Sequence, residues 1–272
     1  MIVAEKEAED LEWQTIGVLG TEVEYRQVGA GQPLVLIDGS LAFRPDGPFL
    51  GDLPNQYRVI SVRFPGFGDK VLPGWISGID DYAYLGNQLI RELGLSHAML
   101  MGTSLGGWIA AEMAAMDASR LSGLFLVDAF GLKSGPMDRL DVPDIFSMSR
   151  TTLESLLYSD LGTFRYDQSA GDDKTLERMA RGWETMALIS WDTFFHNPKL
   201  QYRLAGIDLP TLILRGAADG LVSRQNSEAF ALLIKGAKLE EIENSGHFPM
   251  IEKPRQASSR IATFASMIES RT

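Results

Sequence analysis

The sequence Gly102-Thr103-Ser104-Leu105-Gly106 constrains the fold of this chain more than any other segment. It follows an apolar run at residues 97–101 that predicts a short strand, and it opens a helical pattern. A serine at so sharp a strand-to-helix turn takes a strained backbone conformation, so the residues two positions away must lack a side chain. The free N–H groups of the helix N-terminus then favour negative charge at the serine. The segment predicts a nucleophile at Ser104.

Short apolar or β-branched runs alternate with helical periodicity along the rest of the chain. This alternation is typical of an α/β sheet flanked by helices. The strand-like runs lie at residues 13–18, 22–28, 33–37, 58–64, 97–101, 124–127, 210–214 and 238–242. We therefore expect an α/β sheet in a single domain that carries an insertion.

The stretch from residue 131 to residue 204 contains no convincing strand pattern. Thr151 and Glu154 form a capping-box pattern ahead of one helix, and Asp172 or Asp173 can begin a second. We expect a helical insertion over residues 131–204, within a core made of residues 1–130 and 205–272.

A serine nucleophile needs a general base, and the chain has three histidines. His97 stands at the start of the strand whose far end carries Ser104, about 17 Å away, so it points away from the site. His196 lies in the helical insertion, where we expect a solvated or capping role. His247 follows the run at 238–242, and loops at the carboxyl ends of strands collect catalytic groups. We predict that His247 is the base.

An acid must hold the base in the right tautomer. Two aspartates, Asp128 and Asp219, each follow a predicted strand. Asp219 lies in a loop of small residues, 216–220, which lets a carboxylate turn toward the site. We favour Asp219 as the acid behind His247, with Asp128 as the alternative acid.

The charge of the chain bears on its partners. The 272 residues carry a net charge of −11, which offers no basic face to nucleic acid or to an anionic membrane. No apolar run approaches the roughly 18 residues of a membrane span, and no apolar leader begins the chain. The absence of cysteine excludes a thiolate nucleophile. We expect a cytoplasmic protein with a small-molecule substrate, no cofactor and no metal. Its oligomeric state stays open.

Four segments resemble the α/β-hydrolase superfamily, and together they cover nearly the whole chain. GTSLGG resembles the serine turn, LILRGAADGLV the acid loop, SGHFPMIEKP the histidine loop and VRFPGFGDK the loop after the fourth strand. The order Ser104, Asp219, His247 is that of the family. The resemblance implies a mostly parallel α/β-hydrolase sheet flanked by helices, with a helical cap inserted after the sixth strand.

One segment departs from the family pattern. After the third strand the family usually has His-Gly, in a loop that donates an N–H to the oxyanion, whereas this chain has Asp38 in place of the histidine. Carried over by position, the expected donors are the backbone N–H groups of Ser40 and Leu105. A carboxylate beside an oxyanion opposes catalysis unless it is neutralised. We hypothesise that Asp38 turns away, with Arg44 and Arg63 as candidate partners.

The resemblance also bears on the reaction, because a serine excludes the family members with an aspartate nucleophile. We expect a carboxylesterase that cleaves a small apolar or aromatic ester through an acyl-enzyme, since the insertion is rich in side chains such as Phe146, Trp183 and Phe195. A carbon–carbon bond hydrolase or a lactonase is the alternative. Such carbon–carbon hydrolases typically have tryptophan where this chain has Phe248. A second alternative, favoured by Asp38, is a non-catalytic ligand-binding homologue.

Overall fold

The chain folds around one eight-stranded sheet. The computed structural model describes residues 12–39, 52–136, 138–164 and 172–269. All eight predicted strands are present, with bounds that differ from the prediction by no more than three residues. They are β1 (Gln14–Val18), β2 (Thr21–Val28), β3 (Pro33–Asp38), β4 (Arg58–Arg63), β5 (Ala98–Thr103), β6 (Leu121–Val127), β7 (Thr211–Gly216) and β8 (Lys238–Ile242).

The strands lie in the order β1-β2-β4-β3-β5-β6-β7-β8. The β1–β2 and β2–β4 pairs are antiparallel, and every later pair is parallel. Strands β5 and β7 are buried along their whole length, which explains why they read as continuous apolar runs. The predicted mostly parallel sheet is therefore confirmed.

The parallel register aligns the carboxyl ends of the central strands. Asp38 at the end of β3 pairs with Thr103 of β5, and Thr103 pairs with Val127 of β6. The next residue on each of the last two strands is Ser104 and Asp128. Side chains that are far apart in the sequence therefore emerge at one edge of the sheet, where ligands bind in open α/β folds.

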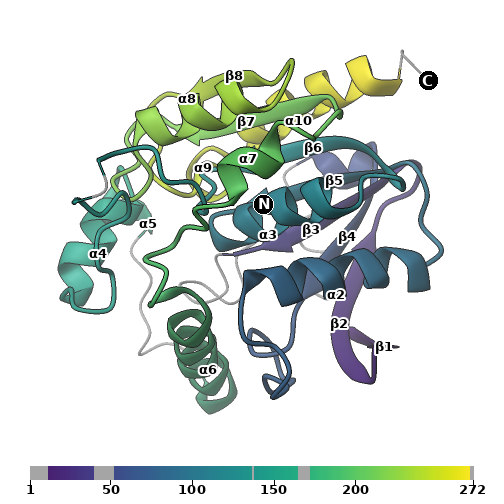
Figure 1. Cartoon of the computed structure of the whole chain (residues 1–272), viewed down its shortest axis with the longest axis horizontal. Helices are drawn as coiled ribbons and strands as arrows, with labels where there is room; N and C mark the ends of the chain where they lie inside the picture. The colour runs from purple at the N-terminus through teal and green to yellow at the C-terminus, as the bar shows by residue number, and fades with distance from the viewer. Residues whose placement is uncertain (1–11, 40–51, 137, 165–171, 270–272) are drawn as a thin grey trace.

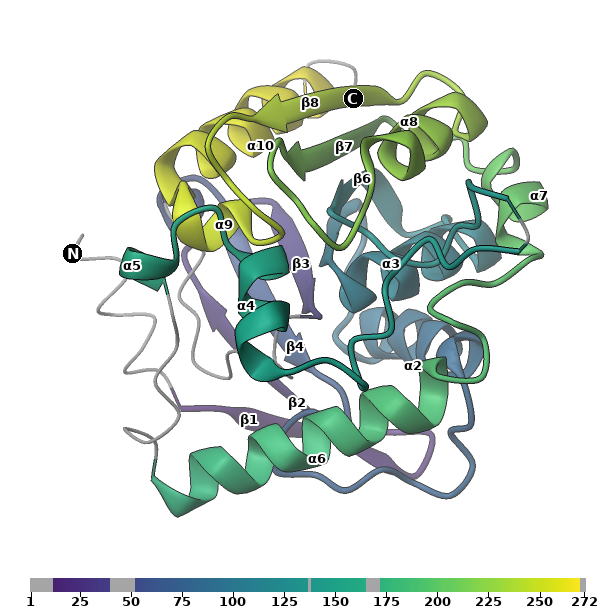
Figure 2. The same ribbon diagram turned by 90° about the vertical axis from the view of Figure 1, so that its left-hand side faces the viewer.

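Helices cover both faces of the sheet (Figure 1). Helices α2, α3 and α8 lie on one face, and α10 lies on the other (Figure 2). No helix in the described parts of the chain is both long and apolar enough to cross a membrane. The described helices are η2 (Leu53–Asn55), α2 (Ile79–Glu92), α3 (Leu105–Met116), α4 (Arg150–Leu157), α5 (Leu161–Phe164), α6 (Asp173–Ser190), α7 (Leu200–Leu204), α8 (Arg224–Leu233), α9 (Pro249–Glu252) and α10 (Pro254–Glu269).

Residues 131–204 contain α4, α5, α6 and α7, and their described part contains no strand. An isolated bridge joins Gly131 to His196 at the base of this segment. In Figure 1, α4 lies to the left of the sheet and α6 lies below it, whereas α7 packs against α3 and α8. The division into a cap of residues 131–204 and a core of residues 1–130 and 205–272 stays a prediction.

The start of α4 differs from the predicted capping box. Its N-cap is Ser149, whose hydroxyl accepts a hydrogen bond from the Thr152 N–H at 3.2 Å. Thr151 is therefore already inside the helix. The next long helix, α6, begins as predicted, because the carboxylate of Asp172 accepts from the Thr175 N–H at 2.8 Å.

Candidate active site

Ser104 occupies a strained turn between β5 and α3. Its backbone φ of 53° and ψ of −120° lie outside the regions that most residues adopt. A side chain at Gly102 would meet the Gly106 carbonyl oxygen at 2.2 Å, and one at Gly106 would meet the Ile37 oxygen at 2.1 Å. Glycine is therefore required on both sides of the serine. The Ser104 N–H donates to the Val127 carbonyl at 2.9 Å, which fixes the turn to β6.

His247 lies beside Ser104 although the two are 143 residues apart in the sequence. Its loop runs from β8 to α9, and its Nε2 lies 2.8 Å from the Ser104 Oγ. Both residues are about 1% exposed. The two side chains therefore form the pair that a nucleophilic serine and its base require.

Asp219 completes a chain of hydrogen bonds. Its Oδ2 lies 2.9 Å from His247 Nδ1, and both side chains are fully buried. Its Oδ1 accepts the N–H groups of Leu221 at 2.8 Å and Val222 at 3.1 Å. The loop thereby fixes the carboxylate, and the carboxylate fixes the imidazole. The structure brings together Ser104, His247 and Asp219, the three residues selected from the sequence.

Asp128, the alternative acid, lies behind Asp219. The two carboxyl groups are hydrogen-bonded to each other, and Asp128 also accepts the Gly216 N–H at 3.1 Å. Its backbone φ of 44° is in the left-handed region, which turns the side chain toward the acid loop. Asp128 therefore supports Asp219, and Asp219 makes the hydrogen bond to His247.

The two carboxyl groups have opposite pKa shifts. Burial raises the pKa of Asp128 well above its usual range, and the neighbouring charge and hydrogen bond of Asp219 raise it further, against the Gly216 N–H and the Arg215 charge. Burial also acts to raise the pKa of Asp219, but the charge and hydrogen bond of His247 and the hydrogen bond from Asp128 lower it overall. Asp128 therefore holds the proton of the pair, and Asp219 is ionised.

The region of the expected oxyanion donors is partly described. Leu105 begins α3, where backbone N–H groups have no partner within the helix. Ser40, Arg44 and the side chain of Asp38 lie outside the described part of the structure. Arg63 is buried, with its guanidinium carbon 3.7 Å from the ring centre of Trp13. The pairing of Asp38 with an arginine stays a prediction.

The other two histidines lie elsewhere. His97 precedes β5 at the end opposite to Ser104, as predicted, and its carbonyl accepts from Gln32 at 3.0 Å. His196 lines a separate cavity of about 190 Å³ with Lys133 and Phe194, among others.

Aromatic rings extend from His247 into the helical segment. Phe130 stacks on the imidazole at 5.3 Å between ring centres, and Phe195 lies 5.1 Å from Phe130. Phe146 stacks on Phe195 at 5.6 Å and contacts Trp183 edge-on at 5.8 Å. Phe146, Trp183 and Phe195 were expected near the site from the sequence. Phe130 was not, although it follows Asp128 by two positions at the same edge of the sheet.

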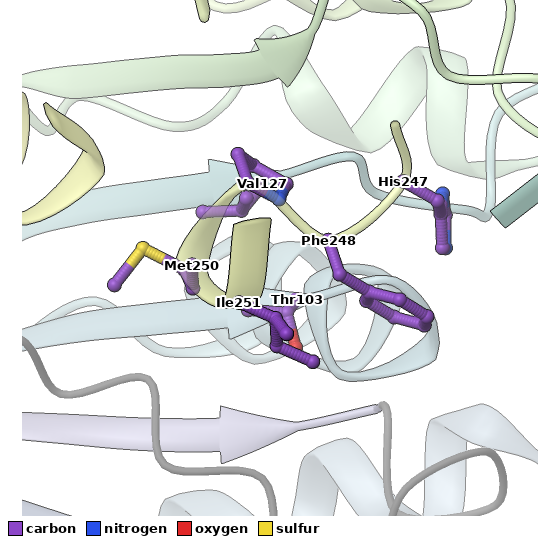
Figure 3. Close-up of a pocket in the computed structure, with 7 residues that line it drawn as sticks. Thr103, Val127, His247, Phe248, Met250 and Ile251 are labelled. Carbon is purple, nitrogen blue, oxygen red and sulfur yellow. The ribbon is translucent and has the colours of Figure 1, made fainter. Parts of the chain in front are cut away.

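A small cavity lies behind the imidazole (Figure 3). Its volume is about 10 Å³, and it is lined by Thr103, Val127, His247, Phe248, Pro249, Met250 and Ile251. A space of this size holds one water molecule at most. This space beside the candidate site is therefore too small for a substrate.

A metal can be tested against the same residues. Asp128, Asp219 and His247 each offer a ligand atom, and these atoms lie within 4.8 Å of one another. Both imidazole nitrogens are already hydrogen-bonded, to Asp219 and Ser104, and Asp128 holds a proton. The donor set therefore fits a hydrogen-bonded chain better than a metal centre. The expected absence of metal and cofactor stays a prediction.

Comparison with known proteins identifies the family. The model of the "Alpha/beta hydrolase family" matches residues 29–260. The AB hydrolase superfamily protein YisY of Bacillus subtilis is 25% identical over 257 residues, which cover 88% of this chain and 93% of that protein. The 2-hydroxy-6-oxo-2,4-heptadienoate hydrolase of Pseudomonas putida is 26% identical over 251 residues, covering 87% and 90%. The structure of a thermophilic esterase from Thermogutta terrifontis superposes with a TM-score of 0.72 at 23% sequence identity. The match covers 94% of this chain and 99% of the esterase chain. The chain belongs to the alpha/beta hydrolase family.

Proposed function

We propose that the chain is a serine hydrolase that cleaves small apolar or aromatic carboxylic esters through an acyl-enzyme. Ser104 is the nucleophile, His247 the general base and Asp219 the acid that orients it. The unbroken chain of hydrogen bonds from Ser104 through His247 to Asp219, at 2.8 Å and 2.9 Å, carries this proposal.

The first half-reaction follows from this geometry. The Ser104 Oγ attacks the ester carbonyl carbon while its proton passes to His247 Nε2. Asp219, ionised and buried, stabilises the imidazolium that forms. The tetrahedral intermediate collapses, the bond to the alcohol oxygen breaks, and His247 returns the proton to the departing alcohol. The products of this step are the free alcohol and an ester on Ser104.

The second half-reaction repeats the sequence with water. His247 removes a proton from a water molecule, whose oxygen attacks the acyl carbon. The bond between the acyl carbon and the Ser104 Oγ breaks, and the Ser104 Oγ recovers a proton from His247. The carboxylic acid is released. In both steps the carbonyl oxygen carries a negative charge, which the N–H groups of Leu105 and Ser40 would stabilise. Each such donor is worth about 10²–10³ in kcat.

The surroundings of His247 support an apolar substrate. Phe130 stacks on the imidazole, Phe195 packs against Phe130 at a tilt, and Phe146 stacks on Phe195, so that these largely buried rings form an aromatic wall beside His247. An apolar acyl or alcohol group loses water-exposed area against such a wall, at about 25 cal/mol per Å² buried. We expect aromatic esters to be cleaved with a lower KM than acetate esters of the same leaving group.

A carbon–carbon bond hydrolase is the second candidate, because the Pseudomonas putida relative is named for a 2-hydroxy-6-oxo-dienoate substrate. Phe248 lies edge-on to His247 at 4.8 Å between ring centres, at the position where those enzymes typically have tryptophan. Incubation with 2-hydroxy-6-oxo-2,4-heptadienoate tests this candidate directly. A kcat/KM above that for every ester would favour it over the esterase.

The first experiment follows nitrophenolate release from p-nitrophenyl acetate, butyrate and benzoate. The wild-type protein is compared with Ser104→Ala and with Ser227→Ala, a buried serine on α8 that serves as the matched control. We expect Ser104→Ala to lose about 10³-fold or more in kcat/KM. Ser227→Ala should retain the wild-type rate.

A fluorophosphonate probe gives an independent readout, because it labels an activated serine without turnover. Mass spectrometry should locate the label on Ser104 in the wild type and in Ser227→Ala. Turnover that persists in Ser104→Ala would contradict the proposed nucleophile. The absence of both turnover and label in the wild type would favour the non-catalytic ligand-binding alternative instead.

A further inference from the structure

The C-terminal end of α4 contacts both loops that carry the candidate acid and base. The last carbonyls of any helix lack partners within it. Here the Leu156 carbonyl accepts the Gly220 N–H at 3.0 Å, and the Leu157 carbonyl accepts the His247 N–H at 2.8 Å. One helix end therefore bonds to the neighbour of Asp219 and to His247 itself.

The approach of α4 to these loops is close enough to require glycine. A Cβ at Gly246 would lie 2.4 Å from the Leu157 oxygen, and one at Gly220 would lie 2.9 Å from the Leu156 Cα. Neither glycine has a left-handed φ, so the backbone conformation alone does not explain them. The contact with α4 does.

A buried carboxylate ties the same elements together. Glu252 on α9 is 5% exposed, and its Oε1 accepts the Ser159 N–H at 2.9 Å and the Ser159 hydroxyl at 2.8 Å. Its Oε2 accepts the Gly246 N–H. The Asp160 N–H also lies 3.3 Å from Oε1. A buried carboxylate is stable only when several donors surround it, and here the donors come from the chain after α4 and from the histidine loop.

The two loops also bond directly to each other. The Ala218 N–H donates to the Ser245 carbonyl at 2.8 Å, and the Ser159 hydroxyl lies 3.0 Å from the Asn244 carbonyl. The end of α4, the acid loop and the histidine loop therefore form one hydrogen-bonded unit, in which a shift of α4 would move both loops.

We propose that residues 156–160 at the end of α4, together with Glu252, form a positioning clamp that holds His247 and Asp219 in line with Ser104. This inference rests on the proposed function for its kinetic consequences. Glu252 and Ser159 are positioning residues, because their contacts reach the loop backbones and not the reacting atoms. The clamp also couples the helical segment over the site to the alignment of the triad.

The test compares Glu252→Gln and Ser159→Ala with the wild type. In Glu252→Gln the side-chain NH₂ replaces one of the two oxygens that accept the backbone N–H groups of Ser159 and Gly246, so a donor then faces a donor. Ser159→Ala removes one hydroxyl from an exposed residue, so we expect the fold to be retained. The matched control is Glu24→Gln, because Glu24 is also 5% exposed and accepts a loop N–H, that of Asp69, but lies on β2.

The kinetic readout separates alignment from binding. We expect Glu252→Gln to lower kcat for a p-nitrophenyl ester by about tenfold or more with little change in KM, because small misplacements of catalytic groups cost rate more than affinity. Ser159→Ala should lower kcat by about fivefold, the value of one hydrogen bond. Glu24→Gln should retain the wild-type kcat.

A second readout does not depend on turnover. Selective ¹⁵N labelling of histidine gives ring signals that can be assigned with only three histidines in the chain, and hydrogen exchange reports the amides of Gly220 and His247. Both should change in Glu252→Gln and in Ser159→Ala but not in Glu24→Gln. Wild-type kcat, ring signals and exchange in both clamp variants would overturn the proposal. If the wild type cleaves no ester, the proposed function fails, and the ring signals and exchange still decide the clamp.

Discussion

The carboxyl groups of Asp128 and Asp219 are hydrogen-bonded to each other in the protein interior, and Asp219 in turn lies 2.9 Å from Nδ1 of His247. A hydrogen bond between two carboxyl groups requires that one of them keeps its proton. The raised pKa of Asp128, caused first by burial and then by the charge of Asp219, assigns the proton to Asp128. The ionised partner, Asp219, faces the imidazole.

The two aspartates should therefore respond differently to the same substitution. Asp219→Asn removes the charge that stabilises the imidazolium, and we expect kcat to fall by about 10⁴-fold. Asp128→Asn keeps an N–H donor toward Asp219, and we expect a loss of less than about tenfold. Ester turnover by the two purified variants measures this difference. An equal loss of kcat in both variants would mean that Asp128 and Asp219 share the role of the acid, which contradicts its assignment to Asp219.

The same pair makes stability depend on pH. In the unfolded chain Asp128 loses its proton above the ordinary pKa of 3.8. In the folded protein burial and the neighbouring Asp219 raise the pKa of Asp128, against the opposing effects of Gly216 and Arg215, so Asp128 keeps its proton to higher pH. Between those two pKa values the folded state binds more protons, so the free energy of unfolding falls as the pH rises. Asp219 has the opposite sign, because its lowered pKa adds stability above 3.8 that is lost only at lower pH.

The measurement compares wild type with Asp128→Asn by urea unfolding from about pH 5 to about pH 7. The variant has no proton to release at this position, so the difference in unfolding free energy, variant minus wild type, should become more positive as the pH rises. The limiting slope for one proton is about 1.4 kcal/mol per pH unit. A difference that is constant over this range would mean that Asp128 is ionised in the folded protein.

Much of this arrangement could be predicted from local sequence patterns. The eight strands are short β-branched or apolar stretches bounded by turn residues, and the six from β4 to β8 in the sheet order pair in parallel. Ser104 directly follows β5, and His247 lies in the loop that follows β8. These features depend on residues that are close together in the sequence, so short sequence patterns are enough to predict them. The fold and the location of the candidate site could be predicted for that reason.

Other features depend on contacts that no local pattern reports. Glu252 bonds to Ser159 across 93 residues, and the sequence gives no sign of which buried carboxylate meets which loop. Asp128 and Asp219 looked like alternatives because both follow strands, and only their tertiary contact shows that they act together. The capping box at Thr151 was misplaced by two residues because Ser149 competes for the same role.

Gly106, two residues after Ser104, should be irreplaceable for a steric reason. A Cβ at Gly106 would lie 2.1 Å from the Ile37 oxygen and 2.9 Å from the Gly39 nitrogen, and both are backbone atoms. We expect Gly106→Ala to lower the free energy of unfolding by about 1–3 kcal/mol, as for other overpacked sites, and to abolish ester turnover. The control is Gly17→Ala on β1, where a Cβ meets nothing within 4 Å. Urea unfolding that places both variants within about 0.5 kcal/mol of wild type would contradict the steric argument.

The ring of Phe130 should matter to His247 beyond its contribution to the core. It stacks on the imidazole with an angle of 21° between the ring planes. Phe125 is equally buried but packs edge-on against Phe264, away from the site. Phe130→Leu and Phe125→Leu are near-conserving in volume, so each should cost less than about 1.5 kcal/mol of stability.

The two variants should nevertheless differ in catalysis. Leucine at position 130 removes a flat neighbour that limits rotation of the imidazole, so we expect kcat to fall by about tenfold in Phe130→Leu and to stay at the wild-type value in Phe125→Leu. Urea unfolding and p-nitrophenyl ester turnover on the same preparations separate the two effects. Equal kcat values at equal stability would mean that hydrogen bonds orient His247, those of its ring with Ser104 and Asp219 and those of its loop with α4 and Glu252. The stacked ring would then contribute packing and nothing more.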